Sequence, residues 1–345
     1  MNVLEKCAAY TLGGATRFYN YFISNPWINK NNKVCRRIRG MLYHNICHEY
    51  LACFGKRNPE KLFYVIRCSK SDLGFMGLYN QIVYHIKQAI EKDAIPVIDC
   101  KYYPNDYLLE DEQVGKINGW EFFFLQPMGI SLEEVYKSKN VIMSAGDAPE
   151  SLLGDVYDSL KLWENHRIIE KYIHLNHSVE EKCIREAERL GFGKHSIMGV
   201  KCRGTDFVSA QPKWHSIPPD AQQTIDKIEE LIKKWGEYEF IFVATEDEQL
   251  FGKMKAYYGN KMISNKTERL SAAETKGKWL NEVFDSGEYP RGYKYDRMLE
   301  YLISVWLLAQ CDVLVAPVVG ATLTAMGMKG QYEHVYLFEL GCYGK

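Results

Sequence analysis

The stretch GVKCRGTDF, residues 199–207, joins an apolar run to a polar one. The apolar run that it completes, 195–202, predicts a buried strand, since continuous apolar runs of about four to eight residues are typical of such strands. That strand ends in two cations, Lys201 and Arg203, a glycine and a carboxylate, Asp206. Such an ending is either a capped entry into a loop or a site for an anion.

The sequence around this stretch alternates between strand-like and helix-like runs. Apolar strand runs lie at 195–202, 238–245, 261–265, 311–317 and 334–340. Runs with a helical spacing of apolar residues lie at 220–235, 246–259, 295–310 and 319–330. Because strands that alternate with helices build a parallel sheet, we predict a doubly wound, Rossmann-like α/β domain over residues 191–345.

A second α/β unit is predicted in the first half of the chain. A strand at 61–68 is followed by a loop with Gly74 and Gly77, a helix at 78–92 and a strand at 94–100. The further predicted elements are a short helix at 131–138, a strand at 140–146 and helix over 151–191. We therefore expect an N-terminal α/β domain over 61–190, which includes a helical connection to the second domain.

The first sixty residues, 1–60, show helical rather than strand periodicity and are locally basic. The cations from residue 30 onward are Lys30, Lys33, Arg36, Arg37, Arg39, Lys56 and Arg57. The acids that oppose them are Glu5, Glu49 and Glu60. A solvated helical surface is the simpler interpretation, and the alternative is a patch for an anionic acceptor or for the face of a membrane.

Composition narrows the class of protein. At 345 residues the chain exceeds the usual single domain of about 100–200 residues, so two domains are expected. A net charge of −1 gives no reason to expect a nucleic-acid partner. The ten cysteines form no CxxC pair and no metal-ligand spacing, which favours buried free thiols in a reducing compartment, the cytoplasm. With no secretion signal and no apolar run of about 18 residues, no transmembrane helix is expected.

Polar residues follow three predicted strands of the second half, and in a parallel sheet these strand ends share one edge. Arg203 follows the first strand, and Glu246 and Asp247 follow the second. The third strand leads into a helix that begins with the small residues Gly320, Ala321 and Thr322. An arginine fork and the N–H groups of a helix start both suit phosphate, so this edge fits a nucleotide diphosphate. Structural interpretations remain, because Arg203 can pair with Asp206 or Glu246, the RGTD turn can cap a helix, and Gly320 can serve helix packing.

The stretch 199–217 resembles the first peptide motif of the fucosyltransferase superfamily that contains the α1,6-fucosyltransferases and the protein O-fucosyltransferases. FVATEDE (242–248) is similar to the second motif of that superfamily. The stretch 301–325 is similar to the third, in which a helix leads to an aspartate, a strand and a small polar turn.

The first half of the chain carries the resemblance further. The stretch 69–86 is similar to the glycine-rich loop and helix of the α1,6 enzymes, and 119–127 is similar to their Gly-Trp-Glu segment. The similarity thus runs in order from about residue 62 to residue 330. Bacterial capsule-type glycosyltransferases with an RGTD motif resemble the chain as well.

This resemblance implies a GT-B architecture, in which two Rossmann-like domains face each other across a cleft. It implies an inverting, metal-independent transfer from a nucleotide-diphosphate sugar, usually GDP-fucose, to a glycan or lipid-linked glycan of a surface polysaccharide. The acidic runs 110–112 and 246–248 contain no DxD motif, which is consistent with catalysis without a metal cofactor. Such an enzyme is expected in the cytoplasm, and at the inner face of the membrane if the basic segment binds lipid.

The resemblance also implies roles for single residues. Arg203 takes the place of the arginine that contacts the β-phosphate, and Asp312 takes that of an aspartate that helps to hold guanine. Glu246 and Asp247 stand where the family has two acids near the donor. The small residues expected near donor or acceptor are Gly320, Ala321 and Thr322 in the second half and Gly74 and Gly77 in the first.

Three positions depart from the family pattern. Lys201 replaces a histidine that helps to read guanine, and Gly204 replaces a second arginine. Gln211 stands where the α1,6 enzymes carry a glutamate proposed as the base, and an amide cannot accept the proton of the acceptor. Either the base comes from elsewhere or the acceptor chemistry differs. The candidates for the base are His215, whose ordinary pKa suits such work, and Asp206.

Two other classes of function stay open. Gln211 favours a non-catalytic module that binds a nucleotide sugar or a glycan. The other class is a further type of Rossmann enzyme, such as an NAD-dependent oxidoreductase. That class is disfavoured, because no predicted strand is followed by the GxGxxG fingerprint of dinucleotide binding.

Overall fold

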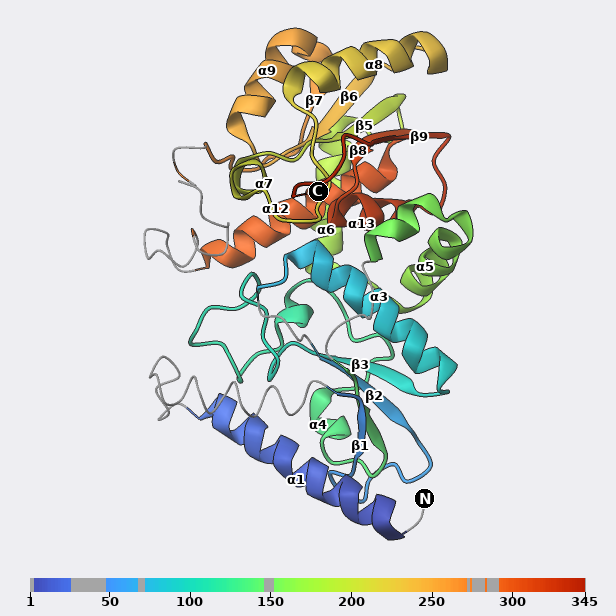
Figure 1. Cartoon of the computed structure of the whole chain (residues 1–345), viewed down its shortest axis with the longest axis vertical. Coiled ribbons are helices and arrows are strands. Elements are labelled where there is room, and N and C mark those ends of the chain that lie inside the picture. The colour runs from blue at the N-terminus through green and yellow to red at the C-terminus, as the bar shows by residue number, and fades with distance from the viewer. Residues whose placement is uncertain are drawn as a thin grey trace. The chain divides into compact units, whose positions relative to one another are not determined.

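The computed structural model describes residues 3–25, 48–67, 72–145, 152–271, 274, 283 and 292–344. The chain divides into two compact units, which are built from the elements labelled in Figure 1. Unit 1 comprises Met1–Leu152 and Arg167–Asn176, and unit 2 comprises Leu153–His166 and His177–Lys345. This division differs from the expected boundaries. The first sixty residues group with the rest of unit 1, and helix α6 (His177–Leu190), expected in the connection, belongs to unit 2.

Unit 2 is built on a parallel sheet of five strands in the order β7-β6-β5-β8-β9. The strands are β5 (Ile197–Lys201), β6 (Phe240–Ala244), β7 (Met262–Ile263), β8 (Val313–Pro317) and β9 (His334–Phe338). All neighbouring pairs are parallel, which confirms the predicted parallel α/β sheet. Lys201 is in register with Ala244, so β5 and β6 end side by side. Because β8 flanks β5 on its other side, the three predicted polar strand ends share one carboxyl edge.

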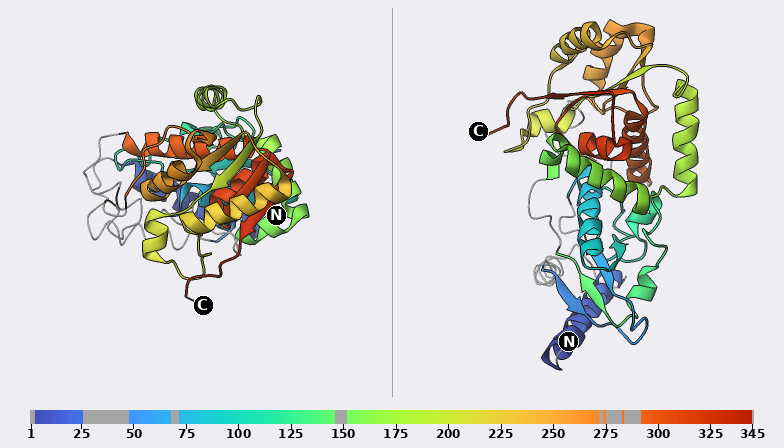
Figure 2. Two further views of the ribbon diagram at one scale, coloured as in Figure 1. Left: turned by 90° about the horizontal axis from the view of Figure 1, so that it is seen from above. Right: turned by 90° about the vertical axis from the view of Figure 1, so that its right-hand side faces the viewer.

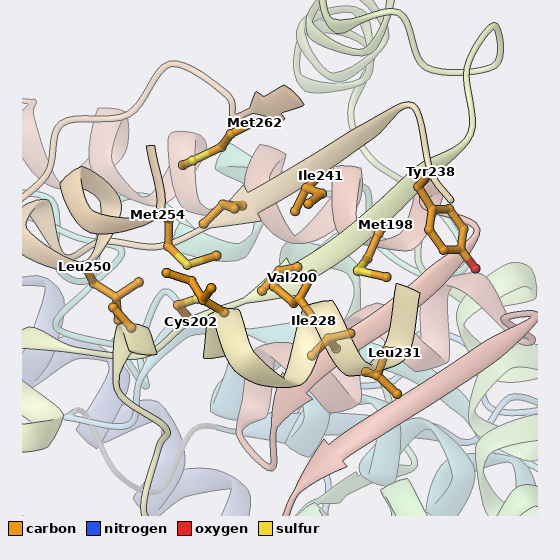
Figure 3. Close-up of a cluster of buried hydrophobic side chains, with 14 of the residues drawn as sticks. Met198, Val200, Cys202, Ile228, Leu231, Tyr238, Ile241, Leu250, Met254 and Met262 are labelled. Atoms are coloured by element: carbon orange, nitrogen blue, oxygen red, sulfur yellow. The ribbon is translucent and has the colours of Figure 1, made fainter. Parts of the chain in front are cut away.

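Helices cover both faces of this sheet (Figure 2). The helices of this unit are α6, α7 (Thr205–Ala210), α8 (Ala221–Trp235), α9 (Glu248–Tyr258), α12 (Tyr293–Gln310) and α13 (Gly320–Lys329), and the short 3-10 helix η3 (Gly259–Lys261) leads into β7. On one face, Met198 and Val200 of β5 pack with Ile228 of α8 and Met254 of α9 in a buried apolar cluster (Figure 3). The apolar stripe that predicted α8 is thus the side of that helix that packs on the sheet.

Unit 1 contains a four-stranded sheet in the order β1-β4-β2-β3. The strands are β1 (Tyr50–Ala52), β2 (Phe63–Arg67), β3 (Ile95–Asp99) and β4 (Val141–Met143). β2 is parallel to β3 and β4, whereas β1 is antiparallel to β4. The helices of this unit are α1 (Val3–Ser24), which packs on β1, then α3 (Phe75–Glu91), α4 (Leu132–Val135) and the 3-10 helix η1 (Gly119–Phe122). β1 corrects the expectation of an all-helical start, since a strand of three residues is too short to show a periodicity.

The chain between the two sheets is helical, as the sequence predicted for 151–191. The elements are the 3-10 helix η2 (Leu152–Tyr157), α5 (Ser159–Tyr172) and α6. The division between the units falls within η2 and α5 and again before α6. Charged residues dominate these helices, and such residues favour helix without indicating which sheet the helix accompanies.

The described cysteines fit the expected free thiols. Cys53, Cys100, Cys183, Cys202 and Cys311 are buried and form no disulfide. Outside the described residues lie Cys68 and the basic residues Lys30, Lys33, Arg36, Arg37 and Arg39. Within the described residues, no helix combines the length and the apolar character that crossing a membrane requires.

Replacing Gly199, in the centre of β5, with valine should lower the free energy of unfolding by about 2 kcal/mol. A Cβ at Gly199 would lie 2.9 Å from Sγ of Cys311 and 3.2 Å from the carbonyl oxygen of Val313, so the sheet must shift to admit it. Gly252 of α9 is the matched control, because a Cβ there would meet nothing within 4 Å. Gly252→Ala should raise stability by about 0.5–1 kcal/mol. Urea titration measures both effects, and a Gly199→Val variant as stable as the parent would contradict the packing of β5 against β8.

Candidate functional site

The carboxyl edge of the unit 2 sheet holds a buried charge cluster. Glu246, which follows β6, accepts a hydrogen bond at Oε2 from Nζ of Lys201 at 3.1 Å. Its Oε1 accepts from Nη1 of Arg203 at 2.8 Å and from the N–H of Gly204 at 3.1 Å. The side chains of Lys201 and Glu246 are only 3% and 12% exposed. One carboxylate thus holds both cations that end β5, and the pairing of Arg203 with Glu246 considered from the sequence is present.

The electrostatics of the cluster keep Glu246 ionised. Burial by itself would raise the pKa of its carboxyl group, because burial disfavours the charged form. The attraction of Lys201 and Arg203, together with the N–H of Gly204, outweighs burial and lowers that pKa to about 2. Lys201 and Arg203 bring two positive charges to this edge and Glu246 one negative charge, while the carboxylate of Asp247 lies beside Gly204. Among the described residues, no group of three or more His, Cys, Asp or Glu side chains could hold a metal ion.

Lys201 is buried among protein groups. Besides Glu246, its Nζ donates to the carbonyl oxygens of Cys202 at 2.8 Å and of Ala244 at 3.4 Å. The centroid of the Tyr301 ring lies 5.9 Å from this nitrogen. These contacts make Lys201 a residue that positions Glu246, while its contact with a nucleotide base stays a prediction.

Gly204 lies where a side chain would collide with Asp247. A Cβ at Gly204 would lie 2.7 Å from both Cβ and Cγ of Asp247. Asp247 is fixed there as the N-cap of α9, where its Oδ1 accepts the N–H of Leu250 at 2.8 Å. The close approach of these two loops therefore explains why glycine, and no second arginine, follows Arg203 in this chain.

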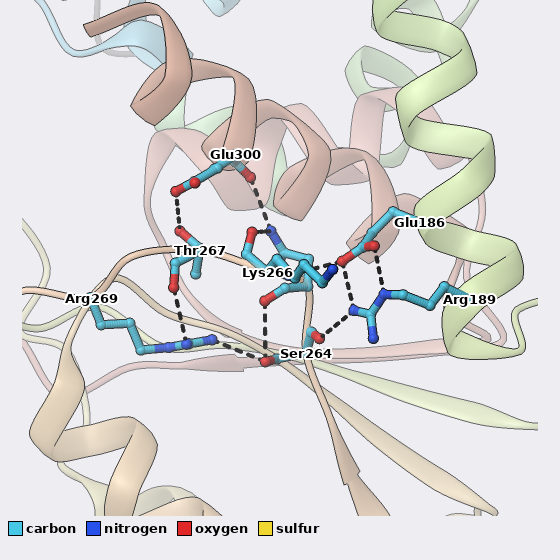
Figure 4. A network of polar contacts seen from close by, with 8 residues as sticks. Glu186, Arg189, Ser264, Lys266, Thr267, Arg269 and Glu300 are labelled. Atoms are coloured by element: carbon cyan, nitrogen blue, oxygen red, sulfur yellow. Dashed lines mark hydrogen bonds and ion pairs between the residues drawn. The ribbon is translucent and has the colours of Figure 1, made fainter. Parts of the chain in front are cut away.

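A polar network holds the segment that follows β7 against α6 and α12 (Figure 4). A backbone N–H of this segment donates to Glu186 of α6 at 2.8 Å, and Oγ1 of Thr267 donates to Glu300 of α12 at 3.0 Å. At the end of the segment, the N–H of Leu270 donates to the carbonyl oxygen of Glu246 at 2.9 Å. The backbone of Glu246 is thus supported by a segment that the sequence predicted only as a polar loop.

The start of α13 lies at the same edge of the sheet. β8, the neighbour of β5, ends at Pro317, and α13 begins at Gly320. Oγ1 of Thr322 donates to the carbonyl oxygen of Pro317 at 2.7 Å, and Ala321 and Thr322 are buried. These side chains therefore shape the turn, and the N–H of Thr322 itself donates to the carbonyl oxygen of Val319 at 3.0 Å. What the start of α13 can offer a phosphate is backbone N–H rather than side chains.

Phe207 connects Arg203 to His215. The guanidinium of Arg203 lies 5.2 Å from the centroid of the Phe207 ring, and the His215 ring meets that ring edge-on at 5.5 Å between centroids. The side chain of His215 is exposed to solvent. Partial desolvation by neighbouring groups and the positive charge of Arg203 nevertheless lower the pKa of its imidazole. The imidazole is therefore neutral at pH 7 and able to accept a proton. Sequence reasoning missed Phe207, although its place at the end of the RGTDF stretch was an available signal.

Backbone pairing with residues 341–343 holds the loop that carries His215. The N–H of Trp214 donates to the carbonyl oxygen of Tyr343, and the N–H of Tyr343 donates to that of His215, both at 2.9 Å. Gln211 begins this loop as the exposed C-cap of α7, with a φ of 44°. The backbone of Asp206 lies in the first turn of α7, and its side chain is outside the described residues. Of the two base candidates, His215 is thus the one whose surroundings can be described.

Asp312 lies at the opposite edge of the sheet. It precedes β8, and its Oδ2 accepts the N–H of Ile197, at the start of β5, at 2.7 Å. The length of β5 separates this edge from Lys201, a distance of about 13 Å by ordinary strand geometry. A hollow of about 420 Å³ at this amino edge is lined by Asp312, His195 and Tyr238, among others. The fold therefore does not bring Asp312 together with the other predicted nucleotide-binding residues of unit 2.

The predicted loop glycines lie in unit 1, at the start of α3. Gly74 is the N-cap of this helix, and a Cβ there would meet nothing within 4 Å. A Cβ at Gly77, in the first turn, would lie 2.9 Å from Cδ1 of Leu73. Gly77 thus has a packing role, and the role of both residues beside donor or acceptor stays a prediction.

Glu246→Gln should lower the free energy of unfolding by about 3 kcal/mol near neutral pH, because it leaves two cations without their shared anion. The folded-state pKa of Glu246 is depressed, so its stabilisation is complete above the ordinary carboxyl pKa and is lost as pH falls toward about 2. The difference between parent and variant should therefore shrink across that acidic range in urea titrations. Glu237→Gln is the control, since the ion pair of Glu237 with Lys261 is exposed. Equal effects of the two substitutions would contradict the buried cluster.

The pKa of His215 should lie below the ordinary histidine value of about 6.5. Partial desolvation by neighbouring groups lowers it first and the charge of Arg203 second, so Arg203→Ala should raise it while leaving it below that value. Titration of the ring proton by NMR, with His215→Asn to assign the signal, measures both. An unchanged pKa in Arg203→Ala would show that the guanidinium does not act on the imidazole.

No protein-family model matches the sequence. No curated protein sequence matches it significantly. Among solved structures, NodZ α1,6-fucosyltransferase soaked with GDP-fucose is similar over 83% of this chain and 97% of its own, with 15% identity and a TM-score of 0.48. Fucosyltransferase NodZ from Bradyrhizobium is similar over 77% and 92%, with 14% identity and a TM-score of 0.46. POFUT1 in complex with GDP is similar over 81% and 99%, with 12% identity and a TM-score of 0.42. Fucosyltransferases are thus among the solved structures that this chain resembles.

Proposed function

We propose that this chain is an inverting, metal-independent glycosyltransferase of GT-B architecture that takes GDP-fucose as its preferred nucleotide-sugar donor. The observation that carries the proposal is the fixed guanidinium of Arg203 at the carboxyl edge of a parallel sheet, near the start of α13. Ligands of open parallel sheets bind at this edge. The resemblance of the sequence motifs supports fucose as the sugar and guanine as the base.

The leaving group is the nucleoside diphosphate. Glu246 holds Arg203 on one side and the Phe207 ring lies against it, so the guanidinium is oriented before a ligand arrives. As the bond between the anomeric carbon and the diphosphate oxygen breaks, negative charge grows on the diphosphate. A guanidinium and helix N–H groups that are already in place stabilise that charge without reorganisation. This is the role that a divalent cation plays in metal-dependent transferases.

The acceptor hydroxyl attacks the anomeric carbon from the face opposite the diphosphate, which inverts the configuration. The proton of that hydroxyl needs a base, and the amide of Gln211 cannot take it. His215 is the first candidate, because its ring is exposed to solvent and contacts the Phe207 ring that lies against Arg203. Asp206 is the alternative base.

The acceptor side of the proposal rests on the resemblance alone. The proposed acceptor is a glycan or lipid-linked glycan. The proposed pathway builds a surface glycan of the capsule or lipopolysaccharide type, and the proposed location of the enzyme is the cytoplasm. Gly74 and Gly77 of α3 are the residues proposed to lie near donor or acceptor. The alternative function, a non-catalytic module that binds nucleotide sugar or glycan, is favoured by Gln211 at the exposed end of α7.

Arg203→Ala should lower kcat/KM for transfer from GDP-fucose by about 10²–10³, because the departing diphosphate loses its cation. Hydrolysis and transfer of labelled GDP-fucose across an acceptor screen measure this effect. Arg185→Ala is the matched control, since Arg185 is an arginine of α6 in the same unit whose side chain is 68% exposed. Both variants should keep a cooperative melting transition.

Retained turnover in Arg203→Ala would refute the phosphate role.

GDP should raise the melting temperature of the parent more than UDP or NAD does, since a ligand that binds only the native state stabilises it. Greater protection by UDP would exclude the guanine assignment. A parent that is protected by GDP yet neither hydrolyses nor transfers fucose would be the binding module instead.

A further inference from the structure

The starts of the unit 2 strands, at the edge opposite Arg203, surround a hollow of about 420 Å³. This amino-edge hollow is lined by residues that lie at or shortly before the starts of β5, β6, β8 and β9. They include Phe192, Lys194, Tyr238, Gln310, Asp312 and Glu333. Pockets of about 300–1,000 Å³ hold small molecules in proteins, so the amino-edge hollow is large enough for an organic ligand.

Two acidic residues of the amino-edge hollow lie at neighbouring strand starts. The N–H of Glu333 donates to the carbonyl oxygen of Asp312 at 3.0 Å. Asp312 is itself fixed, because its N–H donates to the carbonyl oxygen of Ile197 at 3.0 Å and its Oδ2 accepts the N–H of Ile197 at 2.7 Å. Within the described part of the chain, neither carboxylate forms an ion pair. Both negative charges can therefore act on a cation in the hollow.

A buried tyrosine lines the same hollow. Tyr238 is only 7% exposed, and Figure 3 shows its hydroxyl pointing away from Met198 of the apolar cluster. Burial raises the pKa of this hydroxyl first, and the negative charges of Glu333 and Asp312 raise it further, so the hydroxyl lies near both acids. It makes no hydrogen bond to any described residue, although buried tyrosine hydroxyls usually find a partner. Tyr238 therefore directs an unused hydrogen-bonding group into the hollow.

The charge of the lining also favours a cation. α12 ends at Gln310, which lines the hollow, and its last turn contains no basic residue. The C-terminal end of a helix carries a partial negative charge, which attracts cations. Lys194 is the one lysine or arginine among the described residues of the lining, and its exposed side chain pairs with neither acid. His195 of the lining is hydrogen-bonded to Glu239 at 2.7 Å, so this pair adds no net positive charge.

The chemical groups of the amino-edge hollow match an ammonium better than a metal ion. Calcium takes six to eight oxygen ligands, and magnesium usually binds together with substrate phosphates. A primary ammonium has three N–H donors, one for each of the two carboxylates and one for the hydroxyl of Tyr238. Phe192, half-buried beside the ring of Phe242, adds an apolar wall along which a carbon chain can lie. The lining thus fits an ammonium carried by a small organic molecule.

We propose that the amino-edge hollow binds a small organic molecule through a primary ammonium group. The ammonium lies between the carboxylates of Asp312 and Glu333 and donates its third N–H to the hydroxyl oxygen of Tyr238, while the apolar part of the ligand lies against Phe192. This is a second ligand site, at the edge of the sheet opposite Arg203, and it does not rest on the proposed transfer reaction.

Titration of n-butylammonium into the full chain tests the proposal, with binding followed by NMR at an ionic strength of about 0.15 M. The parent should bind n-butylammonium at least about tenfold more tightly than 1-butanol, which has the same carbon chain without the charge. It should also bind n-butylammonium at least about tenfold more tightly than butyltrimethylammonium, which keeps the charge and has no N–H donor.

Variants of the lining locate the binding. Glu333→Gln and Asp312→Asn should each weaken binding of n-butylammonium by about tenfold, and Tyr238→Phe by about threefold. Asp312→Asn keeps a side-chain oxygen for the N–H of Ile197. Glu237→Gln is the matched control, because it removes the same charge from a side chain that is 77% exposed and lies outside the lining.

Three results would overturn the proposal. They are a parent that binds 1-butanol or butyltrimethylammonium as tightly as n-butylammonium, a Glu237→Gln variant that loses as much binding as Glu333→Gln, and a parent that binds Mg²⁺ at these residues more tightly than n-butylammonium. The last result would assign the hollow to a metal ion. Circular dichroism melts show whether the variants are folded, and the exposed Glu333 keeps the test decisive if Asp312→Asn unfolds the chain.

Discussion

The ionised carboxylate of Glu246 is the interaction on which the candidate site depends. It lies buried between two neighbouring strand ends, where it offsets the charge of Lys201 and orients Arg203. Removing Glu246 leaves two cations without their shared anion, at a cost of about 3 kcal/mol, whereas removing Arg203 leaves Glu246 paired with Lys201. Glu246 therefore joins the three side chains into one unit, and Gly204 lets the two loops close around them. Arg203 can therefore pair with Glu246 and also bind a diphosphate, because the ion pair holds the guanidinium in the orientation that the ligand would meet.

Most of the fold could be predicted from the sequence, because buried parallel strands are continuous apolar runs between amphipathic helices. The strands β5, β6, β8 and β9 follow such runs. What could not be predicted was set by packing. β1 has three residues, too few for a periodicity, and the charged sequence of α6 does not indicate which unit the helix joins.

The candidate site was predictable where topology decides it. Arg203, Glu246 and the start of α13 lie at the same edge of the sheet because their strands are neighbours and parallel. The motif resemblance predicted that Asp312 helps to hold the base of the nucleotide. Asp312 precedes β8, however, and so lies at the amino edge of the sheet, opposite Arg203. The position of Phe207 at the end of the RGTDF stretch marked it as a neighbour of Arg203, but its contact with the His215 ring depends on the fold and could not be predicted from the sequence.

The central claim is that a nucleoside diphosphate binds at Arg203, and a crystal structure of the chain with GDP tests it most directly. We expect the β-phosphate to lie about 3 Å from the guanidinium of Arg203, with the first-turn N–H groups of α13 facing the diphosphate. Glu246 should keep its bond to Arg203 in that complex. A diphosphate bound at the amino edge near Asp312, or an Arg203 that makes no phosphate contact, would contradict the claim.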